Sequence, residues 1–347
     1  MLIFKSYPSD KLGAGGFGTI YFCSSKKASK EKEYAVKIEP KDSGPLFCEM
    51  HFYNNCTKKA KLDLWLKSNK SCKHLGVPEY VAHGHLDYKK SELRFLVMPF
   101  FKGGDFQKYI NDQKDKQVPR NILARISIQT IWSLKYIHSC SYAHADIKGM
   151  NILLDKSISN KNDFKSYLVD FGLANRFSNN RVHKPDPKKA GDGTIEYTSL
   201  DAHVGASPSP RGDFEILLYC LVHWATGTLP WWSDLEDKDK VMKKKQEAMK
   251  SSKKFIETCW KNRSDKVWPE LLEFGKVVEK MEYEDDPDHE KLLKFFEKAE
   301  KSKSQVKKVL SESSQDNSPV ATPRRSRRRA AVAKKKIDIS RTELSKY

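Results

Sequence analysis

The stretch HADIKGMN, residues 144–151, decides how this chain of 347 residues is interpreted. It follows a long segment with apolar residues at helical spacing, and it brings Asp146, Lys148 and Asn151 onto one short loop. These side chains suit phosphoryl transfer. The carboxylate can accept or orient the proton of an attacking hydroxyl, the ammonium can offset charge on the moving phosphoryl group, and the amide oxygen can help to hold Mg²⁺.

Two further motifs flank this loop in the chain. Downstream, YLVDFG (167–172) predicts a buried strand that ends at Asp170, a hard oxygen ligand suited to Mg²⁺. Upstream, GAGGFG (13–18) supplies Gly13, Gly15 and Gly18, whose backbone can approach phosphates closely. Taken alone, this motif also fits a hairpin turn without a ligand. Because a β-rich run beginning at Thr19 follows it rather than a helix, we favour a hairpin lying over a nucleotide.

A lysine and a glutamate follow the glycine motif at spacings that suit phosphate binding. Lys37 ends the strand-like run YAVK, and Glu49 lies twelve residues later, near the start of an expected helix. A strand lysine beneath the glycine loop can neutralise phosphates, and an ion pair with Glu49 would orient it. Considered singly, Lys37 could be an edge-strand charge and Glu49 a surface carboxylate near a helix N-terminus.

The periodicity of apolar residues changes along the chain. Short β-rich runs at 19–22, 34–38 and 94–98 surround a predicted helix at 46–66, whose apolar positions are Phe47, Met50, Phe52 and Tyr53. After residue 104, helices are predicted at 121–138, 213–226, 271–281 and 289–300. The pattern predicts an α+β protein with a small β-rich lobe followed by a larger helical lobe.

The composition indicates a basic protein with reduced thiols. The formal net charge is +19, and residues 300–347 alone carry 14 Lys and Arg against 5 Asp and Glu. Two basic clusters, 323–329 and 334–336, suggest a nuclear-localisation signal or nucleic-acid contact, although a solvated charge run stays open. The seven cysteines include no C-x-x-C pair. No apolar run reaches the roughly 18 residues of a membrane span, so we expect a soluble intracellular protein.

Together these motifs resemble the eukaryotic protein kinase family over about residues 8–300. The resemblance implies a two-lobed kinase fold with the small lobe at 1–101, the large lobe at 102–301 and a disordered basic tail at 302–347. It implies that ATP and Mg²⁺ are the cofactors. Asp146 would be the catalytic base, assisted by Lys148 and by Thr194, while Asn151 and Asp170 would bind Mg²⁺. The residues implied in ATP binding are Gly13, Gly15, Gly18, Ile20, Lys37, Glu49, Met98 (as gatekeeper) and Phe100 (in the hinge).

The segment GTIEYTSLDAH (193–203) resembles the casein kinase 1 group, and is more similar still to the vaccinia-related kinases. KIEP at 37–40, HLGVP at 74–78 and the run from Arg211 to Leu217 resemble the same family. That family usually has glycine where this chain has Ala145, and most kinases have an arginine there that binds a phosphate on the activation segment. The resemblance therefore implies activity without such phosphorylation, and it implies that Asp213 braces the catalytic loop.

The function implied by this resemblance is phosphorylation of Ser and Thr in nuclear, chromatin-associated proteins. Histones and a small DNA-bridging protein of the nuclear envelope are the implied substrates. We expect a monomer in the nucleus, with the cytoplasm as a second location, and chromatin or nucleic-acid contact through the tail. The alternative is a pseudokinase scaffold tethered to chromatin by that tail. A small-molecule kinase is disfavoured by the extended segment 173–203, which suggests a platform for peptides.

Overall fold

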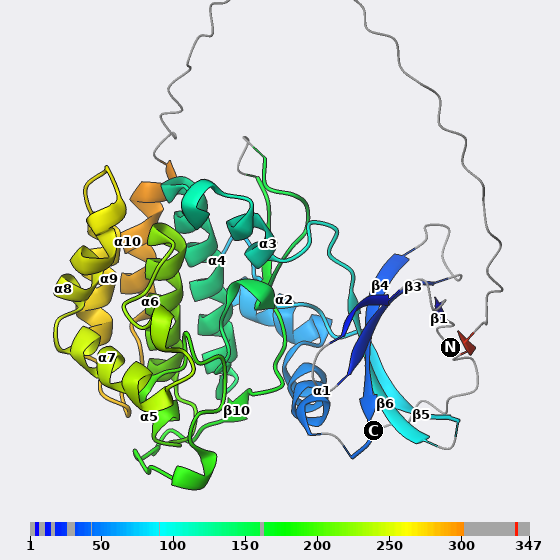
Figure 1. Cartoon of the computed structure of the whole chain (residues 1–347). Helices are drawn as coiled ribbons and strands as arrows, with labels where there is room; N and C mark the ends of the chain where they lie inside the picture. Colours follow the sequence, from blue (N-terminus) through cyan, green and yellow to red (C-terminus); the bar gives the residue numbers. More distant parts are fainter. Residues whose placement is uncertain are drawn as a thin grey trace, which may run out of the picture.

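The computed structural model describes residues 4–6, 11–14, 18–25, 32–42, 44–89, 91–159, 163–301 and 337–338. They form a β-sheet lobe and a larger helical lobe, which is the two-lobed arrangement that the sequence predicts (Figure 1). Of the predicted tail, only Ile337–Asp338 is described; it forms β11 beside β1. The two basic clusters lie outside the described residues.

The small lobe is an antiparallel sheet with the strand order β11-β1-β3-β4-β6-β5, and β2 pairs with β3. Lys37 on β4 lies opposite Ile20 on β3 and opposite Leu96 on β6. Directly opposed residues share a face of the sheet, so the register places Ile20 and Lys37 together. The strands are β1 Phe4–Ser6, β2 Lys11–Ala14, β3 Thr19–Ser25, β4 Lys32–Pro40, β5 Ala82–Tyr88 and β6 Ser91–Pro99.

The helix predicted at 46–66 is two helices, α1 (Pro45–Cys56) and α2 (Lys59–Ser68). The backbone N–H and the hydroxyl of Thr57 both donate to the Tyr53 carbonyl, and Lys58 turns extended, so the chain leaves the helix there. Met50, Phe52 and Tyr53 are buried as expected. Phe47 is not: 61% of it is exposed, and Arg94 lies over its ring.

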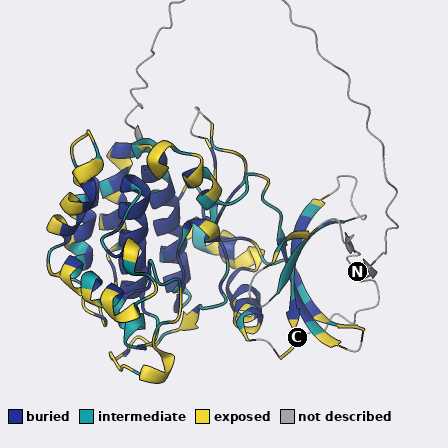
Figure 2. Cartoon of the chain, viewed as in Figure 1, coloured by how far each residue is buried: buried dark blue, intermediate teal, exposed yellow. Residues whose placement is uncertain are grey.

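The large lobe is assembled around α6 (Pro210–Thr226), whose residues are all buried (Figure 2). Ser209 caps the start of α6 by accepting from the Gly212 N–H at 3.0 Å, and Gly227 ends it in the left-handed conformation. The helices predicted from periodicity appear as α4 (Arg120–Ser139), α6, α9 (Pro269–Glu279) and α10 (His289–Lys301). The other elements are α3 Phe106–Asn111, β7 Tyr142–Ala143, β8 Ile152–Leu154, β9 Ser166–Leu168, β10 Asn175–Arg176 and α5 Leu200–His203.

Besides the short helices α3 and α5, the sequence did not predict α7 (Lys238–Lys250) and α8 (Ser252–Cys259) of the large lobe. α7 buries only Val241, Lys245 and Ala248, which lie on one face at positions i, i+4 and i+7. One of these three is a lysine, so the apolar periodicity is too weak to reveal the helix.

Candidate active site

Lys37 joins the small lobe to the large one. Its ammonium donates to the Glu49 carboxylate of α1 at 2.8 Å and to the Asp170 carboxylate at 3.1 Å. Burial alone would lower the pKa of Lys37, but the two carboxylates outweigh it and raise the pKa above its ordinary value. The lysine is therefore a fixed positive charge between the lobes. The structure brings together the pair that the strand-to-helix spacing predicted.

Asp170 is held by the residue that follows it. Phe171 is fully buried, stacks on Phe52 of α1 at 3.9 Å between ring centroids, and meets Tyr53 edge-on at 5.4 Å. Asp170 itself has a left-handed backbone, with φ of +65°. Burial opposes ionisation of its carboxyl, but Lys37 more than compensates and lowers the pKa. The carboxylate side chain is nevertheless 44% exposed, so it remains accessible to a ligand.

Asp146 is the centre of a second cluster. Its Oδ2 accepts from the Lys148 ammonium at 2.8 Å and from the Asn151 amide at 3.1 Å, and its Oδ1 accepts from the Thr194 hydroxyl at 2.7 Å. Lys148 also donates to Thr194 at 2.8 Å. One carboxylate, one ammonium, one hydroxyl and one carboxamide therefore converge, although Thr194 lies 48 positions from Asp146 in the chain.

The buried helix α6 braces this loop through Asp213, which has no exposed surface. The two carboxylate oxygens of Asp213 accept from the backbone N–H groups of His144 and Ala145, each at 2.8 Å. One of them is also 2.9 Å from the His138 ring. The loop backbone is thereby fixed independently of the side chains of Asp146, Lys148 and Asn151.

The backbone at Ala145 has a conformation that is unfavourable for a residue with a side chain. Ala145 has φ of +68°, in the left-handed region that costs an L-residue with a Cβ about 1–2 kcal/mol. Glycine occupies that region without strain, which is a conformational reason for the glycine that the resemblance implies at this position. Ala145 is accommodated because Asp213 holds its N–H.

Most of the described residues that are predicted to bind the nucleotide lie in or beside the strands of the small lobe. A Cβ at Gly18 would collide with the carbonyl oxygen of Ile38, so only glycine fits there. Ile20 is partly buried against the main core, and Met98 is buried beside Ala35 of β4. Gly13 lies opposite Ile20 in the β2–β3 pairing, whereas Gly15 lies outside the described residues.

The predicted hinge begins where β6 ends. The Phe100 N–H donates to the Glu33 carbonyl at 3.2 Å, and its ring meets Phe22 edge-on at 5.0 Å. These contacts fix the chain as it passes from the sheet toward α3.

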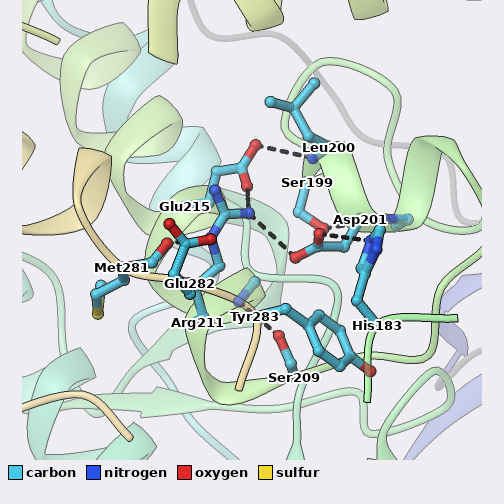
Figure 3. Close-up of polar contacts among 12 residues, drawn as sticks. His183, Ser199, Leu200, Asp201, Ser209, Arg211, Glu215, Met281, Glu282 and Tyr283 are labelled. Atoms are coloured by element: carbon cyan, nitrogen blue, oxygen red, sulfur yellow. Dashed lines mark hydrogen bonds and ion pairs between the residues drawn. The ribbon is translucent and has the colours of Figure 1, made fainter. Parts of the chain in front are cut away.

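The end of the segment 173–203, which we call the activation segment, is tied to α6 by a buried ion cluster (Figure 3). The Arg211 guanidinium contacts Asp201 at 3.0 Å and forms an ion pair with Glu215, which has no exposed surface. Glu215 also accepts from the Leu200 N–H at 2.8 Å. His183, earlier in the same segment, lies 3.2 Å from Asp201. These contacts hold the stretch that contains Thr194 against the large lobe.

Lys245 of α7 is a site residue that the sequence did not indicate. It has no exposed surface, and its amine donates to the carbonyls of Ile195 at 2.8 Å and Thr198 at 2.7 Å. Burial lowers its pKa to about 7. The amine thus fixes the turn directly after Thr194. A lysine on a polar helix resembles any surface lysine in sequence, so no local signal could have identified it.

Known proteins share this architecture. The protein kinase domain family matches residues 7–316. The chain belongs to the protein kinase family. Its relatives include a probable serine/threonine-protein kinase of fowlpox virus, which is 38% identical over 291 residues, covering 82% of this chain and 90% of that protein. B1 kinase of vaccinia virus (strain Ankara) is 34% identical over 285 residues, covering 81% and 89%.

Cellular relatives agree with the viral ones. Nucleosomal histone kinase 1 of Drosophila melanogaster is 38% identical over 290 residues, which cover 83% of this chain but 47% of that protein. The solved structure of vaccinia related kinase 3 superposes with a TM-score of 0.69 at 22% identity, covers 83% of this chain and 86% of that one, and shows the shared fold. The predicted kinase fold and the predicted kinship with the vaccinia-related kinases are confirmed.

The residues present are chemically suited to the family's ATP and Mg²⁺. Asp170 offers a partly exposed carboxylate, and Asn151 offers an amide oxygen, since its amide nitrogen donates to Asp146. The N–H of Val169, which precedes Asp170, donates to the Asn151 carbonyl at 2.9 Å, so the two candidate ligands are coupled through the backbone. Among the described residues, no helix is both long and apolar enough to cross a bilayer.

Proposed function

We propose that this chain is an active serine/threonine kinase that transfers the γ-phosphoryl group of ATP to protein hydroxyls. The observation that carries the proposal is the set of hydrogen bonds around Asp146, in which Lys148, Thr194 and Asn151 all contact one carboxylate. In this role Asp146 orients the substrate hydroxyl and accepts its proton, and Lys148 offsets the charge that develops on the phosphoryl group. Thr194 hydrogen-bonds to both side chains and so fixes their positions relative to each other.

The nucleotide would lie between the lobes. Bound ATP with Mg²⁺ would supply the phosphoryl group and neutralise its charge. Lys37, held by Glu49, is the residue for the α- and β-phosphates, and Asn151 and Asp170 are the metal ligands. Gly13, Gly15, Gly18, Ile20, Met98 and Phe100 form the proposed remainder of the nucleotide site.

Chromatin proteins are the proposed substrates, with histones first. The proposal is supported by the similarity to a nucleosomal histone kinase of Drosophila melanogaster and by the basic composition of residues 300–347, which suits acidic partners. This chain spans about half the length of that relative, so substrate choice and a nuclear location belong to the proposal.

The test is transfer of labelled phosphate from ATP and Mg²⁺ to a histone mixture, comparing wild type, Asp146→Asn and Asp112→Asn. Asp112 is an exposed aspartate at the end of α3 and serves as the matched control. We expect Asp146→Asn to lose on the order of 10²–10⁴-fold in kcat, as for removal of a general base, with unchanged thermal unfolding. Asp112→Asn should keep wild-type activity.

A folded wild type that labels neither histones nor other basic and acidic proteins, and that does not label itself, would contradict the proposal. It would favour a pseudokinase scaffold. Thermal unfolding with and without millimolar Mg·ATP then distinguishes a scaffold that binds nucleotide from one that does not.

A further inference from the structure

Arg181, in the first half of the activation segment, is buried with only 4% of its side chain exposed. Its Nε donates to the Tyr283 carbonyl at 3.2 Å, and its Nη2 lies 2.6 Å from the Glu284 carbonyl and 2.5 Å from the Asp285 carbonyl. These carbonyls belong to the loop 281–286, which lies between α9 and α10. Three backbone carbonyls of one loop thus converge on a single guanidinium, whose charge strengthens the hydrogen bonds.

The carbonyls contribute more to this contact than the neighbouring carboxylate does. Asp286 lies 2.7 Å from Nη2 of Arg181, but its side chain is 84% exposed, and an ion pair with an exposed partner contributes little in water. The loop fixes its own carbonyls, because the Asp285 N–H donates to the Glu282 carbonyl at 3.1 Å and the Asp285 carboxylate accepts from the Glu282 N–H at 2.9 Å. A preorganised set of acceptors loses little conformational freedom when it binds a cation.

The same loop holds the chain at two further points. The His183 N–H donates to the Glu284 carboxylate at 3.0 Å, and the His183 ring meets the Tyr283 ring edge-on at 5.1 Å (Figure 3). The Tyr283 hydroxyl donates to the Ser207 carbonyl at 2.9 Å, just before α6 begins. The loop therefore contacts the activation segment at Arg181 and His183, and it contacts the chain that follows the segment at Ser207.

Backbone hydrogen bonds extend this anchoring toward Thr194. The N–H groups of Asp186 and Gly191 donate to the carbonyls of Val204 and Ala202, at 3.1 Å and 2.9 Å. The first half of the activation segment therefore lies against its far end. Thr194, which contacts the proposed catalytic base, comes three residues after Gly191. Fixing the first half of the segment thus restricts the stretch that contains Thr194.

The charges differ from those that the resemblance to protein kinases implies. An arginine at position 145 would bind a phosphate on the activation segment, but Ala145 has no charge. In this chain the cation lies on the segment itself, and its partners are carbonyls of the large lobe. We propose that Arg181 is a positioning residue for phosphate transfer: docked on the loop 281–286, it holds the activation segment in the arrangement that binds a protein substrate, without a phosphate on the segment. The docking stands on these contacts, whereas its effect on substrate binding rests on the proposed kinase function.

The test compares phosphate transfer from ATP to histones by wild type and Arg181→Met. Without its anchor the segment adopts the substrate-binding arrangement only part of the time, and bound substrate restores that arrangement. We therefore expect KM for the protein substrate to rise on the order of 10-fold, with kcat and KM for ATP within about three-fold of wild type. A variant that merely misfolds would lose kcat instead, because fewer molecules are active. Arg181→Lys should recover part of the loss, since it keeps the charge but not the planar fork.

Matched controls locate the effect. Arg176→Met removes an exposed arginine from β10 of the same segment, and it should leave KM within about two-fold of wild type. Asp286→Asn neutralises the exposed carboxylate and should also stay within about two-fold, because the carbonyls remain. Treatment of wild type with a phosphatase should not change KM. If Asp286→Asn or the phosphatase raises KM as much as Arg181→Met does, the proposal is overturned.

Amide hydrogen exchange tests the docking without any measurement of activity. Peptides that cover residues 182–203 should exchange on the order of 10-fold faster in Arg181→Met than in wild type, while peptides that cover 144–151 stay unchanged. An inactive wild type that shows this difference would contradict the proposed function but support the docking. Equal exchange in the two proteins, or a lower kcat with an unchanged KM for the protein substrate, would overturn the proposal.

Discussion

Two ion clusters in this protein each pair one cation with a buried glutamate and an aspartate, but their surroundings differ. Lys37 with Glu49 and Asp170 lies between the lobes, and Arg211 with Glu215 and Asp201 lies beneath the activation segment. Each has one cation, an almost fully buried glutamate and an aspartate, and the Lys37 cluster has a further buried glutamate, Glu39, at 3.8 Å from the ammonium. The aspartate distinguishes them: the Asp170 side chain is 44% exposed, whereas that of Asp201 is 13% exposed.

The cations differ as well. Lys37 is a point charge on a flexible stem, suited to exchange one anionic partner for another. Arg211 uses its planar fork: one nitrogen serves Asp201 and Glu215, and Nε reaches the Met281 carbonyl at 3.3 Å. The Lys37 cluster, with its lysine and its exposed carboxylate, therefore has capacity for a ligand. The Arg211 cluster is closed, because its cation and carboxylates are already paired with one another, so it stabilises the fold instead.

The largest expected effect comes from the cluster between the lobes. Lys37→Met should lower kcat/KM for phosphate transfer on the order of 100-fold or more, because a preorganised positive charge at the phosphates is lost. The measurement is labelled phosphate transfer under the conditions used for Asp146→Asn. Stability should also fall, because Glu49 is buried and loses its cation, but it should fall less than for Arg211→Met, since Asp170 is open to water.

The control for this substitution is Lys41→Met, which removes an exposed lysine just beyond β4 whose partner is Glu92. It should leave both activity and unfolding within about 0.5 kcal/mol of wild type. If Lys37→Met unfolds the protein as strongly as it inactivates it, the distinction between the two clusters fails.

Arg211→Met should have the opposite profile. It leaves Glu215 as an uncompensated charge with no exposed surface, so we expect a loss of about 3–5 kcal/mol in the free energy of unfolding. Urea denaturation measures this loss. The double variant Arg211→Met/Glu215→Gln should recover part of it, because the neutral amide keeps an oxygen for the Leu200 N–H. No recovery would show that the lost packing of the arginine, rather than the stranded charge, causes the instability.

The sequence predicted the Lys37–Glu49 pair between the lobes, but it predicted neither the contact of Lys37 with Asp170 nor the cluster beneath the activation segment. Lys37 and Asp170 each end a recognisable strand motif, and Glu49 follows at a fixed spacing, so the chemical roles could be written from local patterns. Arg211 and Glu215 were noticed as family-like residues, but their pairing with Asp201 depends on how the activation segment folds back on α6.

Two other features that the sequence did not predict, the burial of Lys245 and the exposure of Phe47, have physical causes. Lys245 lies on helix α7, which buries only three residues. Its amine is buried because the tertiary fold brings two backbone carbonyls against it, and the local sequence does not show this. Phe47 was expected in the core because aromatic residues usually are, yet it lies at the exposed start of α1. Local periodicity identifies elements with broad apolar faces, and it fails where one or two polar contacts decide the packing.

The smallest expected effect concerns Ala145, whose position the sequence marked but whose backbone only the structure shows. The loop that carries Asp146 stores strain at Ala145, with φ of +68°, while Arg211 lies in relaxed helix α6. Ala145→Gly should relieve about 1–2 kcal/mol of strain and lose part of that gain to the freedom of glycine in the unfolded chain, for a net stabilisation of about 0.5–1 kcal/mol. Urea denaturation against wild type measures it. Phosphate transfer should stay within a few-fold, because Asp213 still accepts the N–H of residue 145. A glycine variant that is less stable than wild type would mean that the backbone is not strained at residue 145. The loop that carries Asp146 and helix α6 would then differ in their charged groups but not in backbone strain.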